Sequence, residues 1–183
     1  ISGASCLSQL ILHEVNMSSV SLSQCKQLKK VTLENVDLGD GKLDLSGASC
    51  LSKLCVNNIT VSSITLPECT QLKEVTLDNV KLGDGKLDLS GASCISTLWL
   101  NNVTMSSFSL SQCTPLWQVT LRNVKLGDGK LNLSGASRLS KLCLDNVTMS
   151  SITLSQFTQL HKLIQDNVNL GKVKLNISGD SCM

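Results

Sequence analysis

The chain has few of the side chains from which enzymes build active sites. Its 183 residues include no tyrosine, two histidines, two tryptophans and two phenylalanines. The 16 basic and 14 acidic residues leave a net charge of +2 at pH 7, far from the basic surplus that holds proteins to the phosphates of nucleic acid. We therefore expect no catalytic residues, no enzyme activity and no nucleic-acid partner.

Long apolar segments and metal-ligand patterns are missing as well. No run of residues approaches the 18 apolar positions of a membrane helix, and no signal peptide opens the sequence. The nine cysteines show no CxxC spacing, and no histidine ladder accompanies them. These absences predict no membrane insertion, no metal site and no cofactor.

The sequence is rich in leucine and in repetition. Leucine accounts for 33 residues, about 18% of the chain, so we expect an aliphatic core. Two strings recur every 44 residues. They are SGASC with its variants SGASR and SGDSC, at Ser2, Ser46, Ser90, Ser134 and Ser178, and LGDGKL, at Leu38, Leu82 and Leu126.

Each 44-residue unit divides into two similar halves, which start for example at Leu51 and Leu72. Apolar residues fall at positions 1, 4, 6, 9 and 11 of both halves, the frame LxxLxLxxN/CxL of leucine-rich repeats with Val or Ile at position 9. Eight half-units, 21 and 23 residues long in alternation, begin at Leu7, Leu28, Leu51, Leu72, Ile95, Leu116, Leu139 and Leu160.

Alternation within each half predicts a short strand whose positions 4 and 6 face inward and whose positions 3, 5 and 7 face solvent. One coil cannot bury its apolar edge alone, so coils must stack and share a core. The return segments 62–66 and 83–89 also alternate and contain poor helix formers. We expect residues 1–183 to form one all-β solenoid of about eight coils, with parallel sheets on both faces and little helix.

The two-type repeat resembles the ribonuclease-inhibitor-like class of leucine-rich repeats, which also occurs at the C-terminal end of NOD-like immune receptors. The resemblance rests on residues 80–85, VKLGDG, against the family pattern NxLGDxG, and on the frame of the other half, and it covers essentially the whole chain. The family has longer repeats with a helix on the convex side, where this chain has a strand-like sequence. The resemblance implies a sensing array of an innate immune receptor that recognises a protein or microbial ligand on its concave sheet.

The two ends of the sequence lack the pattern of capping repeats. The chain starts within a repeat, and in the last coil Gln165 occupies apolar position 6 while Lys172 and Val173 replace the Asp and Gly of LGDGK. Since capping repeats normally keep a solenoid soluble, we expect part of a larger array. Uncapped ends would also allow copies of the chain to associate with one another.

The cysteines lie in columns of the repeat, and column members are two coils, or about 10 Å, apart, beyond the reach of a disulfide. Cross-column pairs such as Cys50 with Cys69 are not excluded. The odd count, with Phe157 and Arg138 at column positions, favours free thiols used as small core residues, whereas Cys55 and Cys143 should face outward at position 5. Free thiols predict a cytoplasmic location; glycans on the six N-x-S/T sequons would instead indicate secretion.

Two recurrent polar features have structural interpretations. The glycines of LGDGK suit a turn in which Gly adopts positive φ and Asp bonds the backbone, and the spacing fits neither a phosphate-binding loop nor a calcium β-roll. Asparagine holds position 8 in seven coils. A structural Asn at the strand end explains this better than glycosylation.

The outward strand positions differ in chemical type between copies, while the turns hardly change. Trp99 and Trp117 lie on adjacent coils at positions that need no Trp, and we expect affinity to concentrate there with Arg122 because Trp and Arg are enriched in hot spots. Drift at exposed positions, in a scaffold solenoid without a ligand, is the alternative. The candidate ligand-binding residues of the concave face are Lys30, Lys53, Glu74, Asp78, Trp99, Asn101, Trp117, Arg122 and Asp145.

Overall fold

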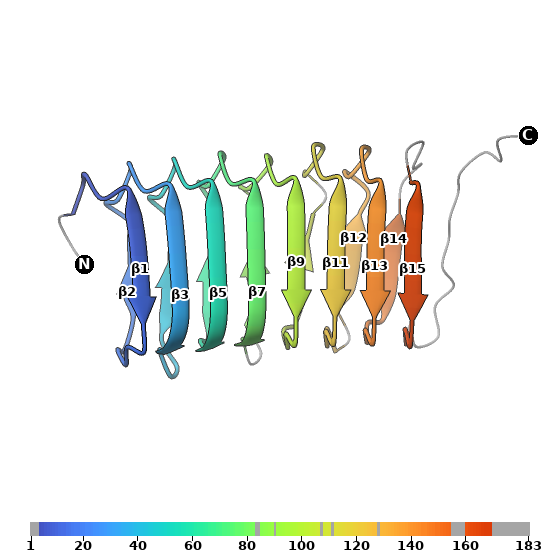
Figure 1. The fold of residues 1–183 in the computed structure, drawn as a ribbon, viewed down its shortest axis with the longest axis horizontal. Helices are drawn as coiled ribbons and strands as arrows, with labels where there is room; N and C mark the ends of the chain where they lie inside the picture. The colour runs from blue at the N-terminus through green and yellow to red at the C-terminus, as the bar shows by residue number, and fades with distance from the viewer. Residues whose placement is uncertain are drawn as a thin grey trace, which may run out of the picture.

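Each coil contributes one strand to a single parallel sheet of eight strands, seen face-on in Figure 1. The computed structural model describes residues 4–82, 85–89, 91–106, 108–110, 112–127, 129–154 and 160–169. In spatial order the strands are β1 (Gln9–His13), β3 (Lys30–Asp37), β5 (Lys53–Thr60), β7 (Glu74–Lys81), β9 (Thr97–Asn101), β11 (Gln118–Arg122), β13 (Lys141–Asp145) and β15 (Lys162–Asp166).

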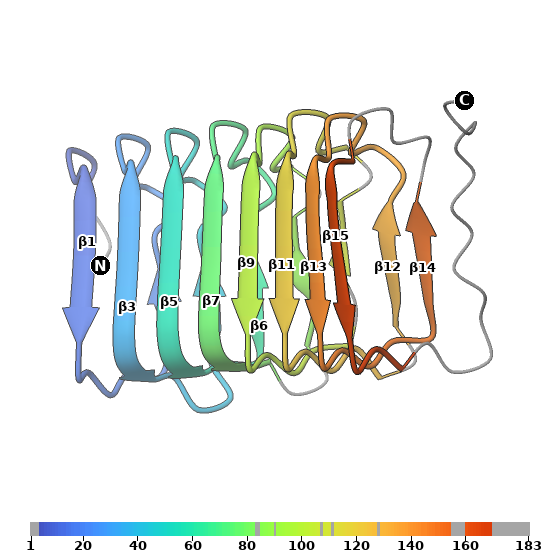
Figure 2. The same cartoon turned by 45° about the vertical axis from the view of Figure 1, so that its right-hand side comes forward.

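The return segments form shorter parallel strands on the opposite face, and in Figure 2 some of them come into view beyond the right-hand edge of the first sheet. Four of them pair in the order β2 (Val20–Ser21), β4 (Lys42–Asp44), β6 (Ser63–Thr65) and β8 (Leu87–Asp88), and three in the order β10 (Phe108–Ser109), β12 (Lys130–Leu133) and β14 (Ser151–Leu154). No helix occurs among the described residues. The predicted all-β solenoid with two parallel faces is therefore confirmed, with about seven full turns between its eight long strands.

The core lies between the two faces and is almost entirely aliphatic. Leu54 and Val56 lie in β5 at positions 4 and 6 of their coil, and each has at most 1% of its surface exposed. The same holds for Val75 and Leu77 in the next coil. Leucines of the return strands meet them from the other side in the same cluster. The predicted inward positions are thus confirmed for the inner coils. In the last coil both inward positions, Leu163 and Gln165, are exposed, and in the first coil Leu12 is only partly buried.

Position 8 bends the chain near the end of the long strands: it directly follows β9, β11, β13 and β15, and lies two residues before the end of β3, β5 and β7. All seven asparagines there adopt positive φ, between 48° and 53°, a region that Asn tolerates better than most residues. Their side chains also bond between coils: Asn102 Nδ2 donates to Asn79 Oδ1 at 2.9 Å, and Asn58 Nδ2 donates to Asn35 Oδ1 at 2.8 Å. The structural interpretation of these asparagines is confirmed.

The glycines of the LGDGKL turn have two separate tasks. Gly39 has φ of +54°, and its N–H donates to Asp37 Oδ1 at 2.8 Å. A Cβ at Gly41 would lie 1.9 Å from the carbonyl oxygen of Ser18 in the preceding coil, so any side chain there would push the coils apart. The turn interpretation holds for this copy.

We predict that two substitutions of Asn79 distinguish the effect of backbone strain on stability from the effect of the lost hydrogen bond. Asn79→Ala should lower the free energy of unfolding by about 1–2 kcal/mol, because alanine tolerates the left-handed backbone poorly and cannot accept from Asn102. Asn79→Gly keeps the backbone relaxed and should cost less than Asn79→Ala. Urea denaturation measures both, with Lys86→Ala as the neutral control. Equal stability of the alanine, glycine and unmutated proteins would contradict the role of positive φ at position 8.

Candidate binding face

In-register pairing arranges the outward side chains of the eight-stranded sheet in rows that run along the solenoid. Cys55 is the register partner of Thr76, and Thr76 is the partner of Trp99. Position 5 therefore forms a central row between the rows of positions 3 and 7. Its members are Ile11, Thr32, Cys55, Thr76, Trp99, Thr120, Cys143 and Ile164.

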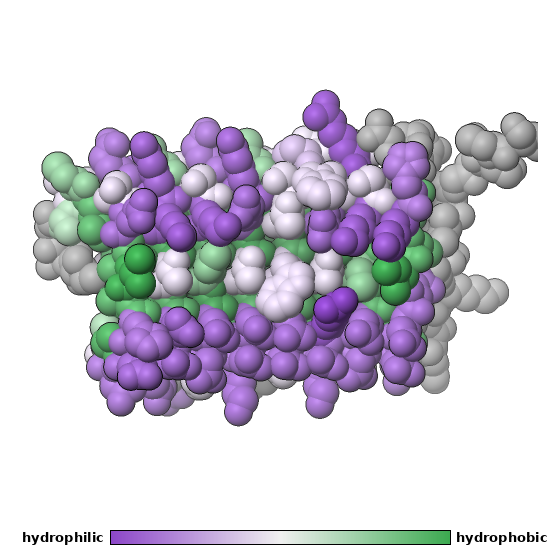
Figure 3. Space-filling view, viewed as in Figure 1, coloured by the Kyte–Doolittle hydropathy of each residue, from purple (hydrophilic) through white to green (hydrophobic). Residues whose placement is uncertain are grey.

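The central row differs from its neighbours in polarity. Figure 3 shows a band of apolar and weakly polar side chains along the middle of this face, between hydrophilic bands on both sides. Isoleucines stand towards the two ends of the band, with Ile11 64% and Ile164 37% exposed. The face thus offers a weakly polar strip within charged borders.

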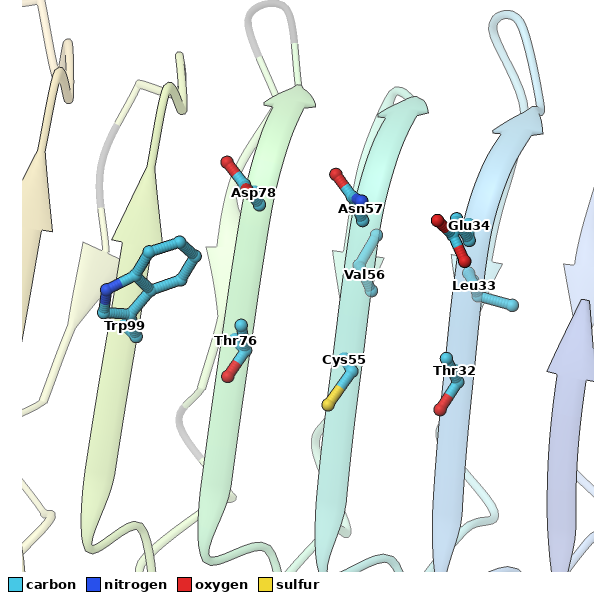
Figure 4. Close-up of a pocket in the computed structure, with 9 residues that line it drawn as sticks. All are labelled: Thr32, Leu33, Glu34, Cys55, Val56, Asn57, Thr76, Asp78 and Trp99. Atoms are coloured by element: carbon cyan, nitrogen blue, oxygen red, sulfur yellow. The ribbon is translucent and has the colours of Figure 1, made fainter. Parts of the chain in front are cut away.

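A groove interrupts this strip beside Trp99. It spans β3, β5, β7 and β9 and has a volume of about 240 Å³. In Figure 4 the small position 5 side chains lie along one side of it, the position 7 side chains along the other, and the Trp99 indole closes one end. The lining residues are Thr32, Leu33, Glu34, Cys55, Val56, Asn57, Thr76, Asp78 and Trp99.

One hydrogen bond and one contact with a histidine hold the acidic border of the groove. Asn101 Nδ2 donates to Asp78 Oδ1 at 2.8 Å, and Glu34 Oε2 lies 3.4 Å from Nδ1 of His13. Along the position 5 side of the groove, Thr32 Oγ1 is buried and is the one such side-chain oxygen or nitrogen without a hydrogen-bond partner in the described part of the chain. A buried polar atom without a partner costs stability.

Among the described residues, the position 3 row carries one ion pair and one unpaired lysine near the groove. Lys53 Nζ lies 2.7 Å from Glu74 Oε2, and this hydrogen bond raises the pKa of Lys53. Both side chains are more than 40% exposed, so the pair contributes little to stability. Lys30 begins β3 in the same row and has no ion-pair partner among the described residues.

Trp99, Trp117 and Arg122 do not form the single cluster that the sequence led us to expect. Trp99 lines the groove, whereas Trp117 is 47% exposed and lies three residues before Thr120, the register partner of Trp99. Three residues of strand span about 10 Å, so Trp117 stands outside the groove. Arg122 Nε is 3.9 Å from Asp145 Oδ2, a weak exposed pair on the side of Trp99 away from the groove.

The two flanks of Trp99 are not equivalent. On the β11 flank, Thr120 is only 5% exposed, and its Oγ1 accepts a hydrogen bond from Gln118 Nε2 at 3.4 Å. On the β7 flank, Thr76 leaves the groove open. The candidate list missed the groove residues Thr32, Glu34, Cys55, Asn57 and Thr76. Three consecutive small side chains at position 5, followed by Trp99, were the available signal.

The described thiols are all free, but they differ in accessibility. Cys69 and Cys113 are core residues, and burial raises the pKa of Cys69 to about 12 and that of Cys113 to about 11. The expectation that Cys143 is accessible at position 5 is wrong, because it is only 4% exposed between its register neighbours Thr120 and Ile164. Cys182 and Phe157 lie outside the described residues.

Comparison with known proteins adds no family assignment. No protein-family model matches the chain, and no curated protein matches it. Within the described ranges, no helix is long and apolar enough to cross a membrane, and no three His, Cys, Asp or Glu side chains group as metal ligands. The interpretation of this face therefore rests on its own geometry.

We predict that thiol labelling follows these differences in burial. In the folded protein near pH 8, Cys6 and Cys55 should react first, while Cys69, Cys113 and Cys143 react only on unfolding. A thiol reacts as its thiolate, and raised pKa values keep Cys69 and Cys113 protonated at that pH. Timed alkylation with peptide mapping measures the order, and unfolding in urea should equalise the rates. Rapid native labelling of Cys143 would contradict the register around it.

Proposed function

We propose that the outer face of the eight-stranded sheet is a recognition surface for a protein partner, with the groove beside Trp99 at its centre. The observation that carries this proposal is the placement of Trp99 among small neighbours, Thr76 and Thr120. The solenoid needs no large side chain at position 5, because the core lies on the other side of the sheet. A half-buried indole beside an open groove has the character of an interface hot spot.

Recognition fits the lining better than catalysis does. Cys55 is the one thiol among the lining residues, and no histidine stands with it. A nucleophilic thiol needs a neighbouring base or cation to activate it; the lining has no histidine for this role, and the neighbouring cation, Lys53, is engaged by Glu74. The groove therefore offers shape, an aromatic surface and carboxylates, which are properties of a binding site.

The repeat pattern and the free thiols extend the proposal to a biological role and a compartment. The repeat pattern resembles that of leucine-rich-repeat arrays in NOD-like receptors, which supports a sensing role in innate immunity. Eight free thiols among the described residues are compatible with a reducing, cytoplasmic compartment. A scaffold solenoid without a dedicated ligand is the competing function, and the Lys53–Glu74 pair, which neutralises two charges of the position 3 row, is compatible with it.

We predict that Trp99→Ala weakens the complex with a partner by about 2 kcal/mol, or roughly thirty-fold. The partner is first captured with this chain and identified by mass spectrometry, and the purified complex is then measured by calorimetry. Trp99 lies outside the core, so its truncation should leave the unfolding transition nearly unchanged. The matched control is Lys86→Ala, next to β8 on the opposite face, which should bind normally.

This experiment distinguishes recognition by the outer face of the eight-stranded sheet from recognition by the return face. Loss of binding with Lys86→Ala together with normal binding of Trp99→Ala and Trp117→Ala would assign recognition to the return face and contradict the proposal. Failure to capture any specific partner would favour the scaffold function.

A further inference from the structure

We propose that the groove beside Trp99 receives an arginine side chain of the protein partner. This inference rests on the proposed recognition function and adds the chemistry of the group recognised. The volume of about 240 Å³ is below the range of roughly 300–1,000 Å³ typical of sites for drug-sized molecules. A single large side chain suits a groove of this size.

The aromatic wall is placed for a flat cation. In Figure 4 the Trp99 indole extends from β9 toward β7, with its six-membered ring on the side of Asp78. A guanidinium group stacks on an aromatic face through cation–π attraction, and tryptophan is the strongest aromatic partner. The ring therefore gives one surface for a planar charged group entering the groove.

The acidic border supplies matching acceptors. Glu34 and Asp78 lie in the position 7 row on β3 and β7, on either side of Asn57. Each carboxylate uses one oxygen in the contacts with His13 and Asn101, while Glu34 Oε1 and Asp78 Oδ2 have no partner among the described residues. A guanidinium carries five N–H donors and no acceptor, so it can engage such oxygens directly.

The charge balance around the groove favours a cation. The lining contains two carboxylates and no basic residue. Lys53, the nearest basic residue of β5, is paired with Glu74, and Lys30 stands four residues from Glu34, about 13 Å along an extended strand. His13 competes for one oxygen of Glu34 only. The local field is therefore negative although the whole chain carries +2.

The test uses two synthetic probes of nearly the same shape, one with a charged guanidinium and one with a neutral ureido group, which has fewer N–H donors and one acceptor. They are acetyl-Gly-Arg-Gly-amide and the same peptide with citrulline, a neutral isostere of arginine. A Trp117→Phe background leaves Trp99 as the only indole, and its Nε1–H signal is followed by NMR titration. The arginine peptide should shift this signal saturably and bind at least ten-fold tighter than the citrulline peptide, with weaker binding at high salt.

Matched carboxylate variants locate the contact. Glu34→Gln with Asp78→Asn should weaken binding of the arginine peptide at least ten-fold. Asp166→Asn removes a position 7 carboxylate on β15, outside the groove, and should leave binding of the arginine peptide unchanged. Equal binding of the two peptides, absence of binding, or normal binding by the double variant would each overturn the inference.

The outcome also separates this inference from the proposed function. If the arginine peptide fails while Trp99→Ala still weakens the captured partner, the face recognises a partner through other chemistry. If Trp99→Ala also leaves the captured complex intact, the proposed binding face itself is wrong.

Discussion

The whole molecule depends on one constraint: no single coil can bury its own apolar edge. A 21- or 23-residue coil offers a few leucines and valines on a thin loop, and only stacking removes them from water. Parallel pairing satisfies the strand backbones at the same time, and the inward residues of successive coils then form one continuous core. Close approach at Gly41 and the bonded asparagines of position 8 maintain that stacking.

The same constraint creates the candidate binding face. Register places every position 5 side chain next to the position 5 side chains of the neighbouring coils, so a change in one copy alters a defined point of a row. The core does not restrict these residues, because they project from the other side of the sheet. A large Trp99 after the smaller Thr32, Cys55 and Thr76 therefore produces a groove with one aromatic end.

The fold could be predicted from the sequence because it follows from periods visible within one coil. Leu54 and Val56 reveal an inward strand face, and the recurrent asparagine marks the bend at or near its end. The groove and the burial of Cys143 could not be predicted with equal ease. Both depend on the sizes of side chains 21 or 23 residues away, such as Thr76 beside Trp99 or Ile164 beside Cys143. The position of a residue within the coil determines the direction of its side chain, whereas the neighbours on adjacent strands determine how much of that side chain is exposed.

Disulfide trapping tests the stacked register most directly. In Thr76→Cys, the new thiol stands beside Cys55 on the adjacent strand, at a Cα separation of about 4.8 Å that a disulfide can span. Ser63→Cys is closer to Cys55 in sequence but lies in β6 on the opposite face, roughly 10 Å or more away. Mild oxidation and peptide mapping should find the Cys55 bond in Thr76→Cys and not in Ser63→Cys. The reverse preference, or no bond in either variant, would contradict in-register stacking.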